Sequence, residues 1–478
     1  MKLLAFTTNL FIALNIFLFS RAYIDDTYIT LAYVENLYEN FQWGIYKDIP
    51  ANSSTSPLNV ILLCLFRVFL RDSELSVLVL SIFFLLGSFY VLQLISQKLG
   101  DLKFFPLVSL VLLFLNPFIF SSIGLEAFGV IFLFTLVVFY SLSKNELGFG
   151  LTTGFLYFLR PDAVVLVLPF LVSYFLNWKK FLKIIFLSIL VNLPVTLYRI
   201  YFFHSIFPDT LIIKKSQLNW GEYSFFNGIL LYLNKYPLET NLSLFPVFIS
   251  LLLLIYVIWK NNLKNSQLVI FLFLSGSLHF FSYSKLKVPP YHWYYAPTFI
   301  PIILGFCVLL DLLFAKVSKN KKVYSLFFLI LLHSFIFGIQ TKYKEMPVHT
   351  NWAKRDDYKL LAESLDRDFS FKVYSLSFGE VGTLAYFSKN VILLDYFTHR
   401  NEIIRLCLDF HKKKPKLDFL NSVVIHLSCL KHSFHEEKLK DFPVTKVFKK
   451  SNEAKAHTYG PLESRWHEKW WLEVSEKN

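Results

Sequence analysis

The sequence has 478 residues, of which 55% are hydrophobic and only 17% are charged. Soluble domains carry about 25% charged residues, so this composition excludes an ordinary soluble domain and indicates a membrane protein with several spans. The formal net charge is +14. In such proteins lysine and arginine set the topology or contact membrane lipids more often than they bind nucleic acid, so we expect no nucleic-acid partner.

The chain begins with an apolar run, residues 3–20, which is close to the roughly 20 residues needed to cross a bilayer. No small-residue cleavage site follows it, so we expect a retained first span. Two adjacent carboxylates, Asp25 and Asp26, come directly afterwards. In one interpretation they lie in a solvated loop where Asp26 or Thr27 caps a helix. In the other they mark a functional site in an otherwise apolar and basic chain.

Charge placement predicts the topology of the following segments. Residues 58–70 number about 13, fewer than the roughly 17 needed for a span, and indicate an amphipathic helix in the membrane interface. Lysines then recur at alternate ends of the apolar runs, as the positive-inside bias requires. The expected further crossings are residues 73–96, 104–122, 127–143, 147–159, 163–177, 184–203, 242–259, 268–283, 296–315 and 323–339. With the first span they make about 11 crossings, with a cytoplasmic N-terminus.

The hydropathy falls from about residue 341 onward. We therefore expect residues 1–340 to form an α-helical polytopic domain, with a first outer loop at 21–72, and residues 341–478 to form a small extracytoplasmic α/β domain. Apolar runs at 371–376, 391–394 and 423–427 predict strands, and residues 401–414 predict a helix. The turn Gly379-Glu-Val-Gly382 predicts a tight strand-to-helix connection more than a phosphate site. Among the four cysteines only Cys407 and Cys429 could plausibly pair.

Several basic residues fall on the predicted outer side, against the charge bias. Each could anchor the chain at the interface, but together they lie on the same side as the two aspartates. They are Arg160, Arg199, Lys214, Lys215, Lys285, Lys287 and His292. A carboxylate can act as a general base on a hydroxyl, and basic side chains can hold a phosphate leaving group. These groups beside a membrane groove suit sugar transfer from a lipid-linked phosphosugar.

Six short segments also occur in a characteristic order. They are Ile24-Asp25-Asp26-Thr27-Tyr28-Ile29, Tyr33-Val-Glu-Asn36, Ser54-Thr55-Ser56-Pro57-Leu58, Gly124-Leu-Glu126, Leu159-Arg160-Pro161-Asp162, and Phe207-Pro208-Asp209-Thr210 with Lys214. This ordered set resembles the GT-C superfamily of membrane glycosyltransferases, and within it the branch of the mycobacterial terminal arabinofuranosyltransferases. The chain departs from that branch at Thr27, Asp162 and Asp209, where alanine, glutamate and asparagine are usual, and it lacks an arginine before Tyr33. These departures affect the expected sugar and acceptor more than the reaction type.

The resemblance implies an inverting enzyme that transfers a sugar from a polyprenyl-phosphate donor to a glycan or lipid-linked acceptor. It places the reaction at the extracytoplasmic face of a bacterial inner membrane. Either Asp25 or Asp26 is then the general base, and Arg160 and Lys214 bind the donor phosphate. Glu126, His292 and Tyr28 are the expected substrate contacts.

Several of these residues, and the function itself, have alternative interpretations. Glu126 could instead stabilise a helix N-terminus, and His292 could belong to an interfacial aromatic belt. A divalent cation could bind the aspartates, but two ligands are too few to define a site, so no metal centre is predicted. A lipid or glycan transporter and a noncatalytic membrane scaffold are the rival functions. The near absence of ionisable residues within the spans counts against an ion-coupled transporter.

Overall fold

The computed structural model describes residues 2–100, 102–216, 219–259, 266–313, 325, 343–413, 429, 444–455 and 457–476. The predicted strand at 423–427 lies outside these residues, as does the predicted span at 323–339 apart from residue 325. The chain forms two compact units. Unit 1 comprises Met1–Arg21, Val77–Asn192 and Asn219–His349, and unit 2 comprises Ala22–Ser76, Leu193–Leu218 and Thr350–Asn478. The predicted domain boundary at residue 340 stays a prediction.

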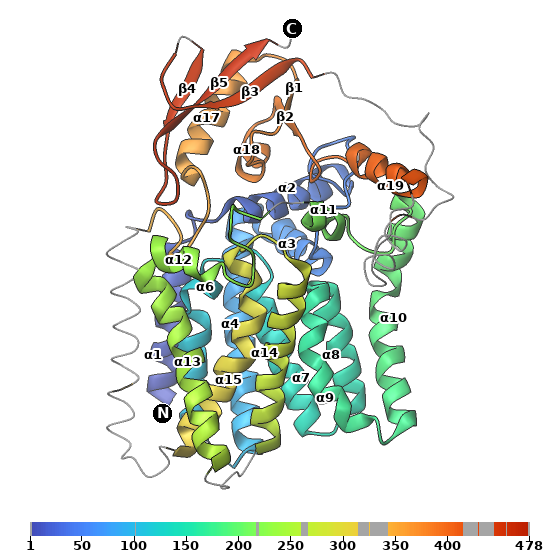
Figure 1. The fold of residues 1–478 in the computed structure, drawn as a ribbon, viewed down its shortest axis with the longest axis vertical. Helices are drawn as coiled ribbons and strands as arrows, with labels where there is room; N and C mark the ends of the chain where they lie inside the picture. Colours follow the sequence, from blue (N-terminus) through green and yellow to red (C-terminus); the bar gives the residue numbers. More distant parts are fainter. Residues whose placement is uncertain are drawn as a thin grey trace. The chain divides into compact units, whose positions relative to one another are not determined.

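Unit 1 is helical (Figure 1). Its helices are α1 (Lys2–Leu18), α5 (Phe105–Phe114), α6 (Pro117–Phe120), α7 (Ala127–Leu142), α8 (Glu146–Leu159), α9 (Leu168–Leu171), α12 (Ile229–Lys235), α13 (Pro237–Trp259), α14 (Ser266–Leu286) and α15 (Ala296–Leu313). It also contains the 3₁₀ helices η1 (Pro161–Val167), η2 (Val172–Tyr174) and η3 (His292–Tyr294), and most of α4 (Ser73–Lys98) and α10 (Trp178–Phe203).

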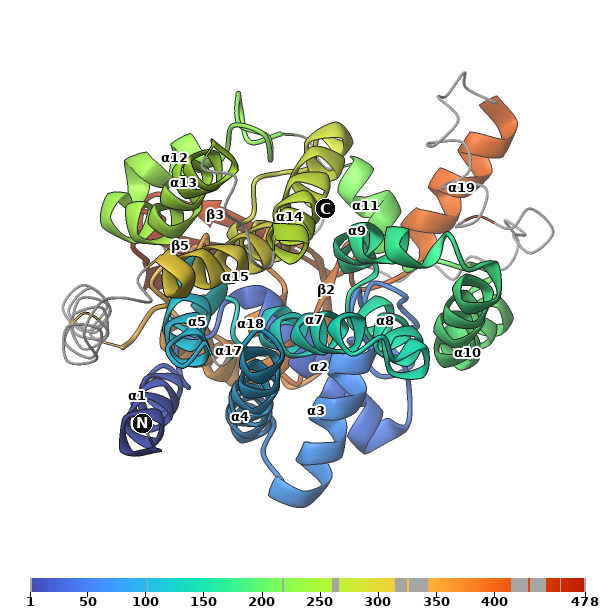
Figure 2. The same cartoon turned by 90° about the horizontal axis from the view of Figure 1, so that it is seen from below.

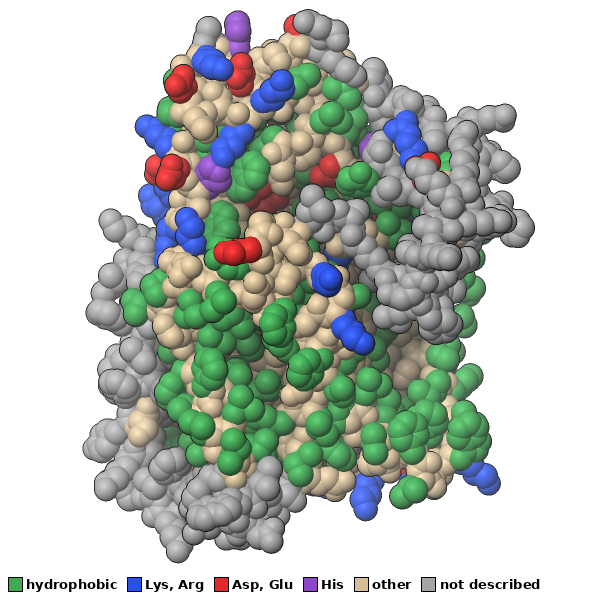
Figure 3. Space-filling view, in the orientation of Figure 1, with side chains coloured by type: hydrophobic (Ala, Val, Ile, Leu, Met, Phe, Trp, Pro, Cys, Tyr) green, Lys and Arg blue, Asp and Glu red, His purple; other side chains and the backbone are tan. Residues whose placement is uncertain are grey.

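The described helices support a membrane protein. Four of them contain segments long and apolar enough to span a bilayer, namely Ser73–Lys98, Trp178–Phe203, Pro237–Ile255 and Gln267–Leu286, and six more are shorter and apolar. Hydrophobic side chains dominate the visible surface of the unit 1 helices, whereas charged side chains gather over the strands of unit 2 (Figure 3). The helical polytopic class is confirmed, while the number of crossings stays a prediction.

Helices α14 and α15 pack closely along each other (Figure 2). A Cβ atom added at Gly276 of α14 would lie 2.7 Å from the carbonyl oxygen of Thr298 in α15, so only glycine permits this approach. Elsewhere the predicted crossing at 104–122 is interrupted between α5 and α6. The side chain of Asn116 caps α6 by accepting hydrogen bonds from Phe118 N (3.1 Å) and Ile119 N (3.4 Å).

Unit 2 contains helices and two small sheets. The helices are α2 (Asp25–Asn40), α3 (Pro57–Leu70), α11 (Thr210–Ser216), α17 (Arg355–Asp368), α18 (Gly382–Phe387) and α19 (Asn401–Lys413). The strands are β1 (Val373–Leu376), β2 (Val391–Leu394), β3 (Lys446–Ser451), β4 (Thr458–Leu462) and β5 (Trp470–Glu476). β1 pairs with β2 in parallel, with Val373 opposite Val391, and β5 lies antiparallel between β3 and β4. The small C-terminal sheet domain is confirmed.

Two further predictions for the first outer loop have different outcomes. Residues 57–70 do form a helix, α3, which exposes Leu65 and Phe69 while burying Val60 and Leu63. That apolar exposed face suits the predicted interfacial position. The predicted cap at Asp26 or Thr27 is wrong, because α2 begins at Asp25 and Ile24 occupies the N-cap position without a side-chain cap.

Candidate functional site

The two adjacent aspartates have different surroundings. The carboxylate of Asp25 is buried and accepts four hydrogen bonds from the segment that begins α18. Its Oδ2 accepts from the backbone N–H groups of Val381 (3.2 Å) and Gly382 (2.9 Å). Its Oδ1 accepts from the backbone N–H (2.7 Å) and the hydroxyl (2.8 Å) of Thr383. Asp25 therefore holds together two segments that are more than 350 residues apart in the sequence.

The turn between β1 and α18 is shaped to receive this carboxylate. Gly379 has a φ angle of +125°, which L side chains rarely adopt. A Cβ atom at Gly382 would lie 2.0 Å from the carbonyl oxygen of Asp25 and 2.8 Å from the backbone nitrogen of Ile29. The predicted strand-to-helix connection is confirmed, and the anion at its N–H groups is a carboxylate of the same chain.

Asp26 lies beside this arrangement and takes no part in the four bonds. Adjacent residues of a helix point about 100° apart, so when Asp25 faces α18 its neighbour faces another direction. Asp26 is half-buried, and its carbonyl oxygen accepts a hydrogen bond from the Thr30 hydroxyl (3.3 Å). Of the two carboxylates, only that of Asp25 is saturated by these contacts to α18.

Glu380, in the same turn, is a residue that sequence reasoning missed. Its side chain is 9% exposed and accepts hydrogen bonds from the Trp352 backbone N–H (2.8 Å) and the Tyr358 hydroxyl. Burial, followed by the negative charge of Asp25, raises the pKa of Glu380 well above its usual value. Burial and the charge of Asp25 therefore favour the protonated form of this carboxyl group. Its position between two turn glycines was the only sequence signal.

Tyr28, a predicted substrate contact, is fully buried in unit 2. Its hydroxyl donates to Glu74 Oε1 (2.6 Å), and the guanidinium of Arg355 bonds both oxygens of Glu74 (3.1 and 2.7 Å). Its ring contacts Tyr386 at a centroid distance of 5.3 Å. These contacts give Tyr28 a packing role, and its contact with a substrate stays a prediction.

Lys214 lies on α11, in a loop that several ionic and polar contacts position. Arg400 pairs bidentately with Asp209 (Nε to Oδ2, 2.7 Å; Nη2 to Oδ1, 3.1 Å). Asn52 donates to Asp209 Oδ1 (3.3 Å), and the Thr55 hydroxyl donates to that of Thr210 (3.2 Å). Four of the six matched segments belong to unit 2: those of Asp25, of Tyr33, of Ser54 and of Asp209. The sequence did not point to Arg400, because its partner Asp209 lies 191 positions away.

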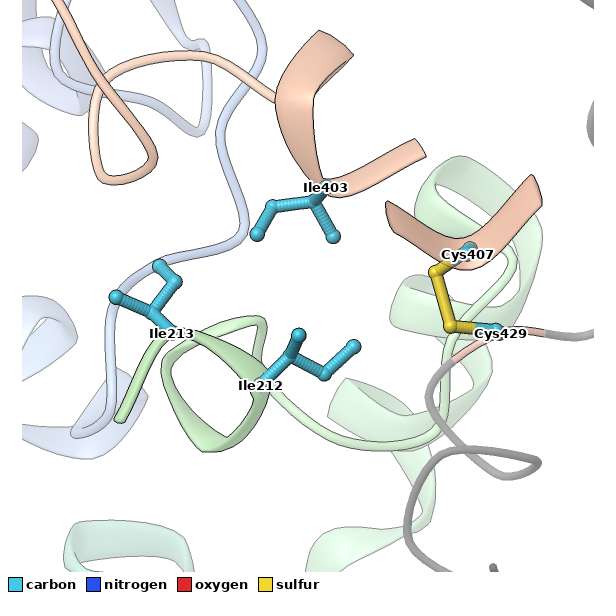
Figure 4. Close-up of a cluster of buried hydrophobic side chains, with 5 residues drawn as sticks. All are labelled: Ile212, Ile213, Ile403, Cys407 and Cys429. Atoms are coloured by element: carbon cyan, nitrogen blue, oxygen red, sulfur yellow. A yellow bond between two sulfur atoms is a disulfide. The ribbon is translucent and has the colours of Figure 1, made fainter. Parts of the chain in front are cut away.

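A small apolar cluster also contacts α11 (Figure 4). Ile212 and Ile213 pack with Ile403 of α19 and with a disulfide between Cys407 and Cys429. The sulfur atoms are 2.07 Å apart. The single pairing that the sequence allowed is therefore present, and Cys64 and Cys307 are free.

Arg160 and Glu126, both predicted site residues, meet in unit 1. Pro161 disfavours helix at the preceding residue, and Arg160 is extended there, ending α8. The buried guanidinium donates to Glu126 Oε1 (2.8 Å) and to both oxygens of Asp162 (3.1 and 3.0 Å). Tyr283 also donates to Asp162 (2.6 Å). Two carboxylates thus offset the charge of Arg160. Although Arg160 was predicted to be one of the basic residues of the outer side, it is buried between two ion-pair partners.

His292 is buried in the loop next to this network. Arg160 makes a long contact with the carbonyl oxygen of the neighbouring Trp293 (3.5 Å). The His292 ring stacks near Phe118 at a centroid distance of 6.3 Å, and neither ring nitrogen hydrogen-bonds to a described residue. Burial, followed by the nearby His349, lowers the pKa of His292 to about 3. A neutral, enclosed imidazole is no open sugar contact in this conformation, so that role stays a prediction.

Metal ligands do not gather in the described part of the chain. Within it, no group of three or more His, Cys, Asp or Glu side chains has the geometry to hold a metal ion. Of the two adjacent aspartates, Asp25 already accepts four protein hydrogen bonds. A cation at this pair would therefore depend on Asp26 and on other ligands.

Comparisons with known proteins identify the fold. No family model matches the sequence, and no curated protein sequence matches it. The structure matches that of ArnT from Cupriavidus metallidurans in the apo state, with a TM-score of 0.55, 11% identity and 97% coverage of both chains. It also matches the arabinofuranosyltransferase AftD from Mycobacteria, with a TM-score of 0.50 and 11% identity, over 94% of this chain but 35% of AftD. The chain therefore shares its fold with these two structures, as the resemblance stated from the sequence implies.

Proposed function

We propose that this chain is a membrane glycosyltransferase that transfers a sugar from a polyprenyl-phosphate donor to a glycan or lipid-linked acceptor, with inversion at the anomeric carbon. The observation that carries the proposal is the pair Asp25-Asp26 at the start of α2, in a chain whose fold matches ArnT over 97% of its length. The order of the six matched segments adds support. Because the sequence identity is 11%, the choice of sugar and acceptor rests on this chain's own residues.

Asp26 is the general base in this proposal. The carboxylate of Asp25 accepts four hydrogen bonds from α18 and the turn before it, so its oxygens are poorly placed to take the proton of an acceptor hydroxyl. Asp26 is half-buried in the same first helical turn. It would take the proton from the acceptor hydroxyl while that oxygen bonds to the anomeric carbon. The bond from that carbon to the phosphate oxygen breaks at the same time, and polyprenyl phosphate leaves with the electron pair.

Lys214 is the proposed contact for the donor phosphate. An ammonium group stabilises the charge that develops on a leaving phosphate, and α11 is fixed on two sides, by the Asp209–Arg400 pair and by the disulfide cluster. Arg160 receives a different role from the one the sequence suggested. With Glu126 and Asp162 as partners, it would position its own loop and leave phosphate binding to Lys214.

The reaction is proposed to occur at the extracytoplasmic face of a bacterial inner membrane, with the N-terminus in the cytoplasm. The lysine clusters at the predicted inner turns support this orientation. The Cys407–Cys429 disulfide supports it independently, because disulfides persist in oxidising compartments outside the cytoplasm.

The test is sugar transfer by the purified full-length protein in lipid nanodiscs, with a lipid-linked donor. We expect Asp26→Asn to abolish transfer while donor binding remains, and Lys214→Gln to raise the KM for the donor. Transport of lipid across the membrane without transfer would favour the transporter. Normal assembly of a partner complex with no transfer at all would favour the scaffold.

A further inference from the structure

A cavity of about 450 Å³ opens among the ends of α7, η2, α10 and α14 in unit 1. Its volume falls within the range of about 300–1,000 Å³ that is typical of small-molecule sites. Both polar and apolar side chains line it. The polar ones include Lys144, Tyr174, Asn177 and Lys180, and the aromatic ones include Phe170 and Phe271. It contains none of the residues assigned to sugar transfer.

One polar group of the cavity lacks a partner. Tyr174 is 6% exposed, and its hydroxyl has no hydrogen-bond partner among the described residues. A buried hydroxyl without a partner costs free energy, and native interiors rarely keep one unsatisfied. A ligand that brings an acceptor oxygen into the cavity would supply the missing hydrogen bond.

The charge of the cavity is positive. Lys180 pairs with Glu146, so those two charges compensate each other. Lys144 is exposed after α7 and forms no ion pair with a described residue. One ammonium group, the Tyr174 hydroxyl and the aromatic rings of Phe170 and Phe271 therefore line the same space. This combination suits an anion attached to hydrocarbon.

We propose that this cavity binds the head group of an anionic phospholipid from the inner leaflet. The phosphate would lie against Lys144 and accept a hydrogen bond from Tyr174, and the first part of an acyl chain would contact the two phenylalanine rings. Basic pockets between transmembrane helices on the cytoplasmic side are known settings for anionic lipid head groups. The inference uses the proposed membrane orientation but not the transferase activity, so its failure would leave the proposed reaction untouched.

The test is native mass spectrometry of the full-length protein from nanodiscs of phosphatidylcholine and phosphatidylglycerol in equal parts. We expect phosphatidylglycerol to remain bound in preference to phosphatidylcholine. Lys144→Gln should weaken that binding about fivefold, the effect of one basic residue near an anionic surface. Tyr174→Phe, which changes no charge and little volume, should also weaken it. Lys98→Gln, at the end of α4 and outside the cavity, is the matched control.

Three results would overturn the proposal. One is equal retention of phosphatidylcholine and phosphatidylglycerol by the unmodified protein, which would make the cavity an unselective lipid contact. Another is equal loss of phosphatidylglycerol in the Lys98→Gln and Lys144→Gln variants, which would assign the effect to the overall surface charge. Inorganic phosphate that binds as tightly as phosphatidylglycerol would likewise exclude a lipid site.

Discussion

Replacing Asp25 by asparagine should destabilise unit 2 strongly, although the two side chains have the same shape. Asp25 accepts from three backbone N–H groups and one hydroxyl. Whichever way an asparagine amide turns, its NH₂ group faces at least one of those N–H donors. At least one hydrogen bond to a charged acceptor is then lost, and a buried N–H is left unsatisfied.

The magnitude follows from these two losses. A hydrogen bond to a charged group contributes about 1.5–3 kcal/mol, and an unsatisfied buried donor costs about 1–3 kcal/mol. We therefore expect a loss of about 3 kcal/mol or more in the free energy of unfolding. For a domain of this size that corresponds to a melting temperature lower by about 6–12 °C. Thr383→Val, which removes only the hydroxyl donor to Asp25, should cause a smaller decrease.

The assay is thermal unfolding of the detergent-purified protein, combined with limited proteolysis of the C-terminal domain. Asp48→Asn is the matched control, because Asp48 is exposed and bonds only to Gln42 among the described contacts. If the Asp25→Asn and Asp48→Asn proteins have the same melting temperature, Asp25 does not hold α18 in place. Asp25 would then again be a candidate for the general base.

Four further variants test other parts of the structure. Gly382→Ala should cost about 1–3 kcal/mol in thermal unfolding because its Cβ would meet the Asp25 carbonyl oxygen at 2.0 Å; an unchanged melting temperature would contradict the close packing. The raised pKa of Glu380 stabilises the fold while this carboxyl is neutral, so wild-type stability should fall as pH rises above the ordinary value of 4.5, and Glu380→Gln should remove that part of the pH dependence. If the stability of the two proteins instead changed with pH in the same way, Glu380 would be ionised in the folded state. Reduction, or Cys407→Ser, should destabilise the region around α19 by about 3 kcal/mol, since the bond closes a loop across 22 residues; non-reducing peptide mapping should find that link and leave Cys64 and Cys307 free. Arg160→Met should destabilise unit 1 by about 3–5 kcal/mol because Glu126 and Asp162 lose their buried counter-charge, and a stable variant with weaker donor binding would restore the phosphate role of Arg160.

The sequence was sufficient to predict the class of fold, a helical membrane protein with a small C-terminal sheet domain. Hydropathy and lysine placement predict membrane helices, and short apolar runs located β1 and β2 within two residues. The ordered motifs pointed to Asp25-Asp26 and to the loop of Lys214. These features are local, so a single sequence contains them.

The distinction between the two aspartates was not predictable. It depends on α18, whose donors lie more than 350 residues from Asp25, and on the 100° rotation between neighbouring helical positions. The roles of Glu380 and Arg400 could not be predicted for the same reason, because their hydrogen-bond partners come close to them only in the folded unit. It also hid the ion pair of Arg160, which the sequence placed among the basic outer residues, because Glu126 lies 34 positions away in the sequence and beside it in space.

Asp26 and Asp25 are expected to have separate roles, with Asp26 in proton transfer and Asp25 in holding the structure together. The most direct measurement compares Asp26→Asn with Asp25→Asn for sugar transfer in nanodiscs and for thermal unfolding. We expect Asp26→Asn to stay folded and to keep donor binding while transfer falls by at least about 100-fold, as for the loss of a general base. Full transfer by a stably folded Asp26→Asn protein would contradict the claim.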